Sequence, residues 1–207
     1  ALTLQATGQV VDEQGAPVAG ATVTVRSVST VPGTDASGIT DSDGRFVLAL
    51  DAATPAVLQV QKTGYASGFR AAASVASNAS VAARVVLLPV ATTLSFDATQ
   101  AAVLRVPGSP ARVELAAGSL VREDGQPISG STRVALTPID PSADIARMPG
   151  LMVDAASGAP IESLGALTIE FTDASGAPLN LASGQTATVR IPATPAVGAT
   201  LPATYPL

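Results

Sequence analysis

Apolar and polar residues alternate one by one in many short stretches of this chain, and this pattern constrains the fold more than any other feature. In residues 21–26, Val23 and Val25 alternate with threonine and arginine. The pattern recurs in residues 46–50, 58–61, 133–136, 167–171 and 187–191. A period of two puts alternate side chains on opposite faces of a strand, whereas a helix needs a period of about 3.6. The alternation therefore predicts an all-β fold.

Turn signals separate these stretches. A Gly-x-Pro triplet follows an acidic residue and precedes an aliphatic one at residues 15–17, 125–127, 158–160 and 176–178. Glycine permits the left-handed backbone of a tight turn, and proline fixes φ where the next segment starts. Short strands joined by such turns are typical of β-sandwiches.

The 207 residues are enough for two ordinary domains. A strand-like run, residues 85–88, ends one alternating block before Pro89, and residues 90–93 open another. We therefore expect two consecutive β-sandwich domains, at residues 1–89 and 90–192. Residues 193–207 are rich in proline, which suits an extended connector, and we expect the native chain to continue beyond them.

Four motifs of the first block occur in a familiar order: GQVVD at residues 8–12, GAPVAGATVTV at 15–25, TDSDGRF at 40–46 and KTGY at 62–65. In this order and spacing the block resembles the carboxypeptidase regulatory-like domain. The resemblance implies a transthyretin-like, immunoglobulin-like sandwich. It also implies a non-catalytic spacer, adhesion or accessory module of a secreted or outer-membrane protein.

The second block carries a looser pattern in residues 125–130, 134–140, 149–150, 163–167 and 173–181. Across residues 92–192 it resembles the β domain that follows such a module in ectodomains of the cartilage intermediate layer protein type. This resemblance transfers no catalytic motif.

The composition excludes several kinds of chemistry. The chain has no histidine and no cysteine, which removes imidazole bases, imidazole and thiolate metal sites, disulfides and cysteine nucleophiles. No G-x-S-x-G motif occurs either, so we predict that the chain is not an enzyme. A net charge of −5 argues against nucleic-acid binding. Polar residues interrupt every apolar run well short of the ~20 residues of a membrane span, so we expect no membrane insertion.

Calcium is the one cofactor for which the sequence offers candidates. Asp35, Asp41 and Asp43 crowd one loop, and calcium prefers oxygen ligands of this kind. The alternative is a plain hairpin turn, in which Asp43-Gly44 supplies the left-handed residue and Asp41 caps its own backbone. The sequence leaves both interpretations open.

Lys62 is the only lysine, and it shares strand parity with Leu58 and Val60 on the expected buried face. A buried lysine loses its proton more easily, which would suit an intramolecular isopeptide bond to Asn78 or Asn180. The alternative is a lysine at a strand end that extends its ammonium group to water.

These observations predict a structural or adhesive module of a secreted or cell-surface protein, with the periplasm or outer membrane as alternatives. The preference for arginine over lysine and the abundance of alanine suggest a bacterial source. We expect its partners to be copies of itself or other surface proteins, joined through strand edges into a filament or stalk. The alternative is a glycan- or calcium-binding accessory domain of a larger secreted protein or enzyme.

Overall fold

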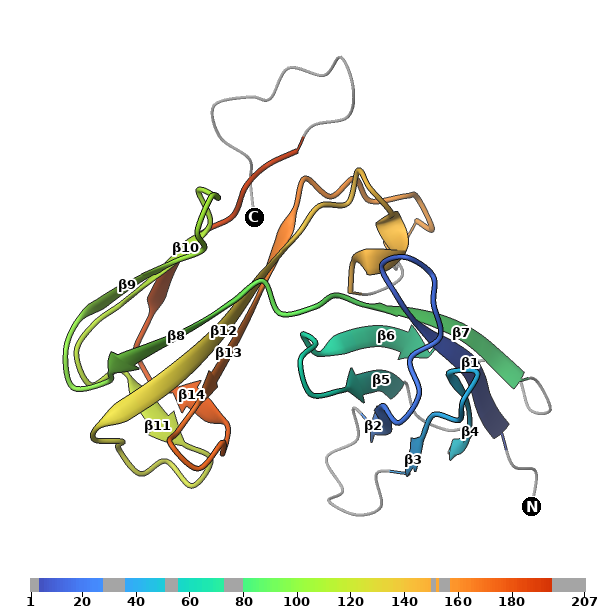
Figure 1. The fold of residues 1–207 in the computed structure, drawn as a ribbon, viewed down its shortest axis with the longest axis horizontal. Helices are drawn as coiled ribbons and strands as arrows, with labels where there is room; N and C mark the ends of the chain where they lie inside the picture. Colours follow the sequence, from blue (N-terminus) through green and yellow to red (C-terminus); the bar gives the residue numbers. More distant parts are fainter. Residues whose placement is uncertain are drawn as a thin grey trace. The chain divides into compact units, whose positions relative to one another are not determined.

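The computed structural model describes residues 4–27, 36–50, 56–72, 80–149, 152 and 157–194 (Figure 1). Within these ranges the regular structure is β, apart from one short 3₁₀ helix, η1 (Ile145–Arg147). The all-β prediction is therefore confirmed. The chain divides into two compact units, of which the first comprises residues 1–89 and 146–162 and the second residues 90–145 and 163–207.

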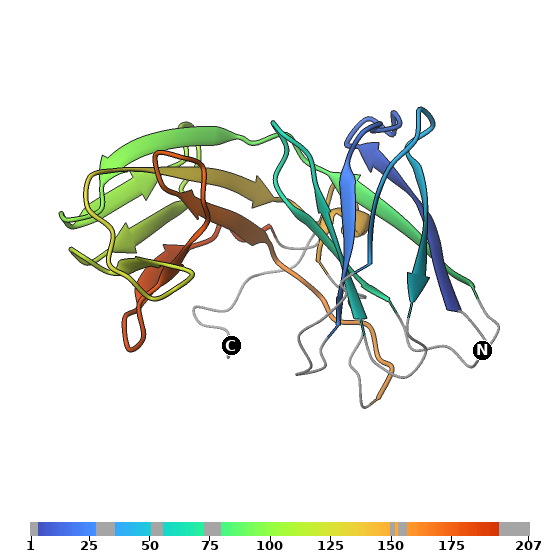
Figure 2. The same cartoon turned by 90° about the horizontal axis from the view of Figure 1, so that it is seen from below.

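The first unit contains two sheets (Figure 2). One has the order β4-β1-β7, formed by β1 (Leu4–Asp12), β4 (Arg45–Leu50) and β7 (Ser80–Leu87). The other has the order β3-β2-β5-β6, formed by β2 (Thr22–Ser27), β3 (Ser37–Ile39), β5 (Ala56–Gln61) and β6 (Gly68–Ala72). Strands β1 and β7 are parallel, and the other pairs are antiparallel.

The aliphatic faces of these sheets form the core of the first unit. Val25 and Val23 on β2 lie opposite Leu58 and Val60 on β5, and all four side chains are buried in one cluster. The valine alternation that predicted β2 thus points its apolar side inward, as expected for a half-buried strand.

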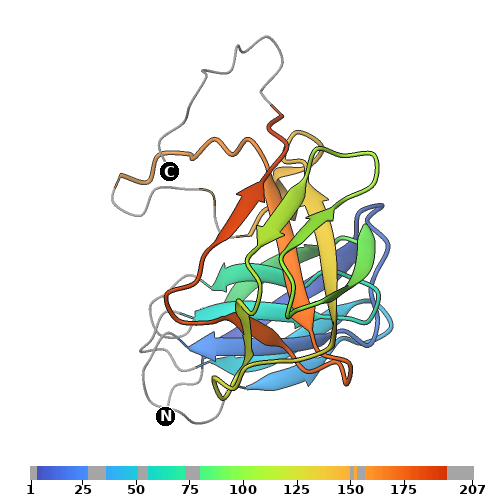
Figure 3. The ribbon, with the colours of Figure 1, turned by 90° about the vertical axis from the view of Figure 1, so that its left-hand side faces the viewer.

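The strands of the second unit also pair into antiparallel sheets (Figure 3). One sheet, of order β13-β12-β8, contains β8 (Thr92–Asp97), β12 (Ser131–Ile139) and β13 (Ala166–Thr172). Another, of order β15-β10-β9, contains β9 (Ala102–Arg105), β10 (Arg112–Leu115) and β15 (Ala187–Arg190). Strands β11 (Leu120–Arg122) and β14 (Leu179–Leu181) pair separately. All pairings in this unit are antiparallel.

The central strands of the second unit supply its most buried side chains. Val113 on β10, and Val134 and Leu136 on β12, are each 0% exposed and share one cluster. Each lies on a strand with neighbours on both sides, which is where the sheet protects its inner face best. Across the described residues, no helix is long and apolar enough to cross a membrane.

Candidate functional site

Three aspartates hold turns of the same geometry. In each turn, the aspartate Oδ1 accepts the backbone N–H groups of the residues two and four positions later. The distances are 2.9 and 2.8 Å for Asp12, 2.9 and 2.8 Å for Asp41, and 2.9 and 3.0 Å for Asp173. The backbone N–H of each aspartate also donates to the carbonyl four residues later. Each carboxylate therefore acts as a fixed part of its turn.

Two of the three calcium candidates lie in one of these turns. Asp41 binds the backbone of Asp43 and Arg45, and the carbonyl oxygen of Asp43 accepts the Gln9 amide at 2.9 Å. Asp35 lies outside the described residues. In the described ranges, no group of three or more acidic, histidine or cysteine side chains could hold a metal ion. The calcium loop stays a prediction, and the observed role of Asp41 is to cap the hairpin.

Lys62 follows β5 directly and is half-buried. Its Nζ donates a hydrogen bond to the carbonyl oxygen of Gly20 at 3.2 Å. Of the two asparagines considered as partners, Asn78 lies outside the described residues, and Asn180 is exposed on β14 of the second unit. The isopeptide bond stays a prediction.

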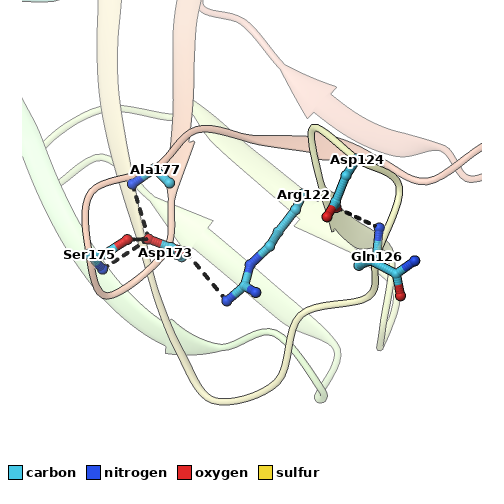
Figure 4. Close-up of polar contacts among 6 residues, drawn as sticks. All are labelled: Arg122, Asp124, Gln126, Asp173, Ser175 and Ala177. Atoms are coloured by element: carbon cyan, nitrogen blue, oxygen red, sulfur yellow. Dashed lines mark hydrogen bonds and ion pairs between the residues drawn. The ribbon is translucent and has the colours of Figure 1, made fainter.

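A fourth turn keeps the backbone geometry but changes the chemistry (Figure 4). Arg122 stands where the other turns have aspartate, and its backbone N–H donates to the Gln126 carbonyl at 2.9 Å. Arginine has no acceptor atom in its side chain. Asp124 takes over one of the two hydrogen bonds, because its Oδ1 accepts the Gln126 backbone N–H at 3.0 Å.

The Arg122 side chain is thereby free to reach the neighbouring turn, where its Nη2 lies 3.6 Å from Asp173 Oδ2. The pKa of Asp173 is lowered, chiefly by a hydrogen bond from the Ser175 hydroxyl at 2.5 Å and then by the backbone N–H of Ala177. Arg122 is the smallest contributor to that shift, and burial opposes it. This carboxylate is therefore committed to its turn, and the ion pair joins the turn that follows β11 to the one that precedes β14.

The edge strand β13 leaves its apolar side chains partly exposed, whereas apolar side chains opposite them on β12 are buried. All seven of its residues are half-buried, and Leu167, Ile169 and Phe171 pack against the core but keep part of their surface exposed. Directly opposite on β12, Leu136 and Val134 are 0% exposed. Within the described ranges β13 forms a ladder with β12 alone. Its other edge therefore presents backbone groups beside apolar side chains.

The edge strand β15 also leaves an apolar side chain exposed. Val189 is 40% exposed, although Val113, opposite on β10, is 0% exposed. The segments that flank the two edge strands meet, because the Thr194 N–H donates to the Leu164 carbonyl at 2.7 Å. Strands β13 and β15 therefore lie on the same side of the second unit. The sequence predicted that strand edges are exposed but gave no signal for which ones, because edges follow from strand order.

The comparison with protein families concerns the first unit. Residues 5–88 match the family model of the carboxypeptidase regulatory-like domain. The resemblance predicted for this part of the chain is confirmed. The match covers less than half of the chain, and the likeness of the second unit to ectodomains of the cartilage intermediate layer protein type stays a prediction. A search of curated proteins finds no match.

Several solved structures share a general likeness. A 3-chlorocatechol 1,2-dioxygenase from Rhodococcus opacus is 16% identical with a TM-score of 0.34, and the match covers 42% of this chain and 60% of the dioxygenase. A hydroxyquinol 1,2-dioxygenase from Pseudomonas putida is 13% identical with a TM-score of 0.33, covering 43% and 57%. A shaft pilin from Lactobacillus rhamnosus GG is 14% identical with a TM-score of 0.31, covering 89% and 80%. The likeness thus spans under two thirds of the length of either dioxygenase.

Proposed function

We propose that this chain is a non-catalytic structural or adhesive module of a bacterial secreted or cell-surface protein, and that copies associate by strand addition at the open edge of β13. The observation that carries the proposal is this edge, where the half-buried side chains of Leu167, Ile169 and Phe171 lie beside backbone groups without a ladder partner in the described residues. An incoming strand would pair with that backbone and cover alternate apolar side chains.

The use of the carboxylates supports a non-catalytic role. Asp12, Asp41 and Asp173 each bind two backbone amides of their own turn. A carboxyl group that acts as a general acid instead has to face a substrate, and its pKa is raised toward neutral. The pKa of Asp173 is shifted the other way. The match of residues 5–88 to the carboxypeptidase regulatory-like domain agrees with the same role.

Sedimentation velocity over a wide range of concentrations, with electron microscopy of the same samples, tests this proposal. We expect the full chain to form larger species as its concentration rises. Ile169→Lys places a charge on the inner side of β13, a device by which natural edge strands prevent pairing, and should keep the chain monomeric. Monomers of the unsubstituted chain at all concentrations would count against strand addition.

Leu94→Lys is the matched control. Leu94 is also half-buried and packs partly against the same core, but it lies on β8, at the other edge of the same sheet. Both variants add one charge to a half-buried edge position, so a general loss of stability would affect both. We expect Leu94→Lys to associate like the unsubstituted chain, and association that depends on Leu94 instead would place the interface at β8.

The second candidate function is a calcium- or glycan-binding accessory domain. The observation that favours it is the clustering of Asp41 and Asp43 in one hairpin, close in sequence to Asp35. Calorimetric titration of the full chain with calcium tests the metal, with Asp43→Asn as the comparison. Heat of binding that this variant abolishes would favour the accessory domain over a purely structural module.

A further inference from the structure

Three arginines stand in one row across the outer face of the sheet β15-β10-β9. Arg112 on β10 lies directly opposite Arg105 on β9 and Arg190 on β15. Inner and outer positions alternate along β10, and Val113 and Leu115 are buried, so Arg112 belongs to the outer face. Adjacent strands are ~4.8 Å apart, so the three backbone positions of the row span about 10 Å. The Arg112 side chain in the middle is 24% exposed, and Arg105 and Arg190 on either side are exposed.

This row carries an excess of positive charge in an acidic chain. Among the described residues, the acidic side chain that pairs with the row is Glu114, whose Oε1 accepts a hydrogen bond from Arg112 Nε at 2.7 Å. In the described part of the chain, neither Arg105 nor Arg190 forms an ion pair. Like charges directly opposite each other on neighbouring strands destabilise a sheet. Three arginines in register thus lower the stability of the free module, which a bound anion would restore.

The side chains of this face restrict the kind of ligand that it can bind. The next row across the same three strands is Val103, Glu114 and Thr188, so neither row contains an aromatic ring on which a neutral sugar could stack. The backbone groups of β10 pair with strands on both sides. A peptide could add as a strand only at the outer edges of β9 and β15, where it would lie beside the arginine row and not across it. Recognition here depends on side-chain guanidinium groups, which bind carboxylates and sulfates through paired hydrogen bonds.

We propose that this face binds an anionic polysaccharide, one whose carboxylate or sulfate groups repeat along the polymer and pair with Arg105, Arg112 and Arg190. This names a ligand for the adhesive function proposed above and rests on it. The site shares no residue with the β13 edge, because its arginines belong to β9, β10 and β15. Adhesion to the polymer and association of copies can therefore be measured independently.

The test measures binding of the full chain to immobilised polygalacturonate and heparin, with dextran as the neutral polymer and polyglutamate as the acidic peptide. We expect both anionic polysaccharides to bind, more weakly as salt rises, and dextran not to bind. The variant Arg105→Gln/Arg190→Gln should weaken binding by about tenfold, because it removes two charge-assisted contacts.

The matched control is Arg45→Gln/Arg133→Gln, which removes the same charge from exposed positions on β4 and β12. It should bind within about twofold of the unsubstituted chain, because it leaves the row intact. The melting temperature of Arg105→Gln/Arg190→Gln should be equal or higher, because the substitution relieves like-charge repulsion.

The proposal would be overturned if neither anionic polysaccharide bound, or if dextran bound equally well. It would also be overturned if the two double variants lost equal amounts of binding affinity. Tighter binding to polyglutamate would overturn it too and would assign the face to an acidic protein. Sedimentation of the same samples separates this failure from that of the strand-addition proposal. If the chain associates through β13 but does not bind the polymers, only the assignment of an anionic polysaccharide as ligand is contradicted.

Discussion

Two glycines in the first unit allow the contribution of a single Cβ atom to be isolated. Gly15 and Gly44 occupy the same position in the turns of Asp12 and Asp41, with φ of 84° and 70°. A Cβ at Gly15 would meet nothing within 4 Å. A Cβ at Gly44 would overlap the carbonyl oxygen of Val10 and lie 3.1 Å from the backbone nitrogen of Val18. The turns are therefore alike in backbone conformation and different in surroundings.

The magnitude follows from this difference. Gly15→Ala should destabilise by about 1–2 kcal/mol, the cost of a left-handed residue that carries a Cβ. Gly44→Ala has the same cost and adds overlap with backbone atoms, for which overpacking values of about 1–3 kcal/mol are typical. The entropy that alanine removes from the unfolded chain is the same for both and cancels. We therefore expect Gly44→Ala to be less stable than Gly15→Ala by about 1–3 kcal/mol.

Urea unfolding followed by far-UV circular dichroism measures both free energies. With a slope of about 1–3 kcal/mol per molar urea, the two midpoints should differ by about 1 M. Gly125→Ala, at an equally open turn of the second unit with φ of 81°, provides a reference that leaves the first unit unchanged. Equal midpoints for Gly15→Ala and Gly44→Ala would refute the reasoning. They would mean that the turn of Asp41 can move away from Val10 on β1 without any loss of stability.

Three further predictions concern the second unit. Leu136→Ala should lower the free energy of unfolding by about 2–5 kcal/mol in the same urea assay, because its side chain is 0% exposed between two strands. The pKa of Asp173 is lower in the folded state than in the unfolded chain. The ionised carboxylate therefore adds its full contribution to the free energy of unfolding above the pKa of the unfolded chain, and this contribution is lost as pH falls through the pKa of the folded state. Urea midpoints from pH 7 to pH 2 should show this loss in the unsubstituted chain and a smaller one in Asp173→Asn, which should be the less stable protein at pH 7. Arg122→Gln should leave the midpoint at pH 7 almost unchanged, because the Arg122 side chain is 54% exposed and contributes least to the pKa shift; a loss as large as that of Asp173→Asn would contradict this ranking.

The sequence predicted the parts of the fold that depend on neighbouring residues. The alternation of Val23 and Val25 places both side chains in the core, and Asp41 caps the hairpin that its spacing from Gly44 suggested. Both effects act over a few residues, so they can be read along the chain. The interpretation of Asp41 as a turn residue was one of two that the sequence left open.

The candidate sites depend instead on strand register, which the sequence does not state. Arg112 and Arg190 are separated by most of the second unit, yet they lie directly opposite each other on β10 and β15. Arg122 meets Asp173 only because β11 pairs with β14. The exposure of Ile169 likewise follows from the position of β13 at the end of its sheet. Shifting any of these registers by one residue would place the side chains on the other face.

Hydrogen–deuterium exchange of the full chain at low and high concentration tests the proposed association most directly. The account predicts that amides of β13 gain protection as concentration rises, together with those of the strand that joins it, while the turns of Asp12 and Asp41 stay unchanged. Protection that does not change with concentration, or that rises on β8 while β13 continues to exchange, would contradict it.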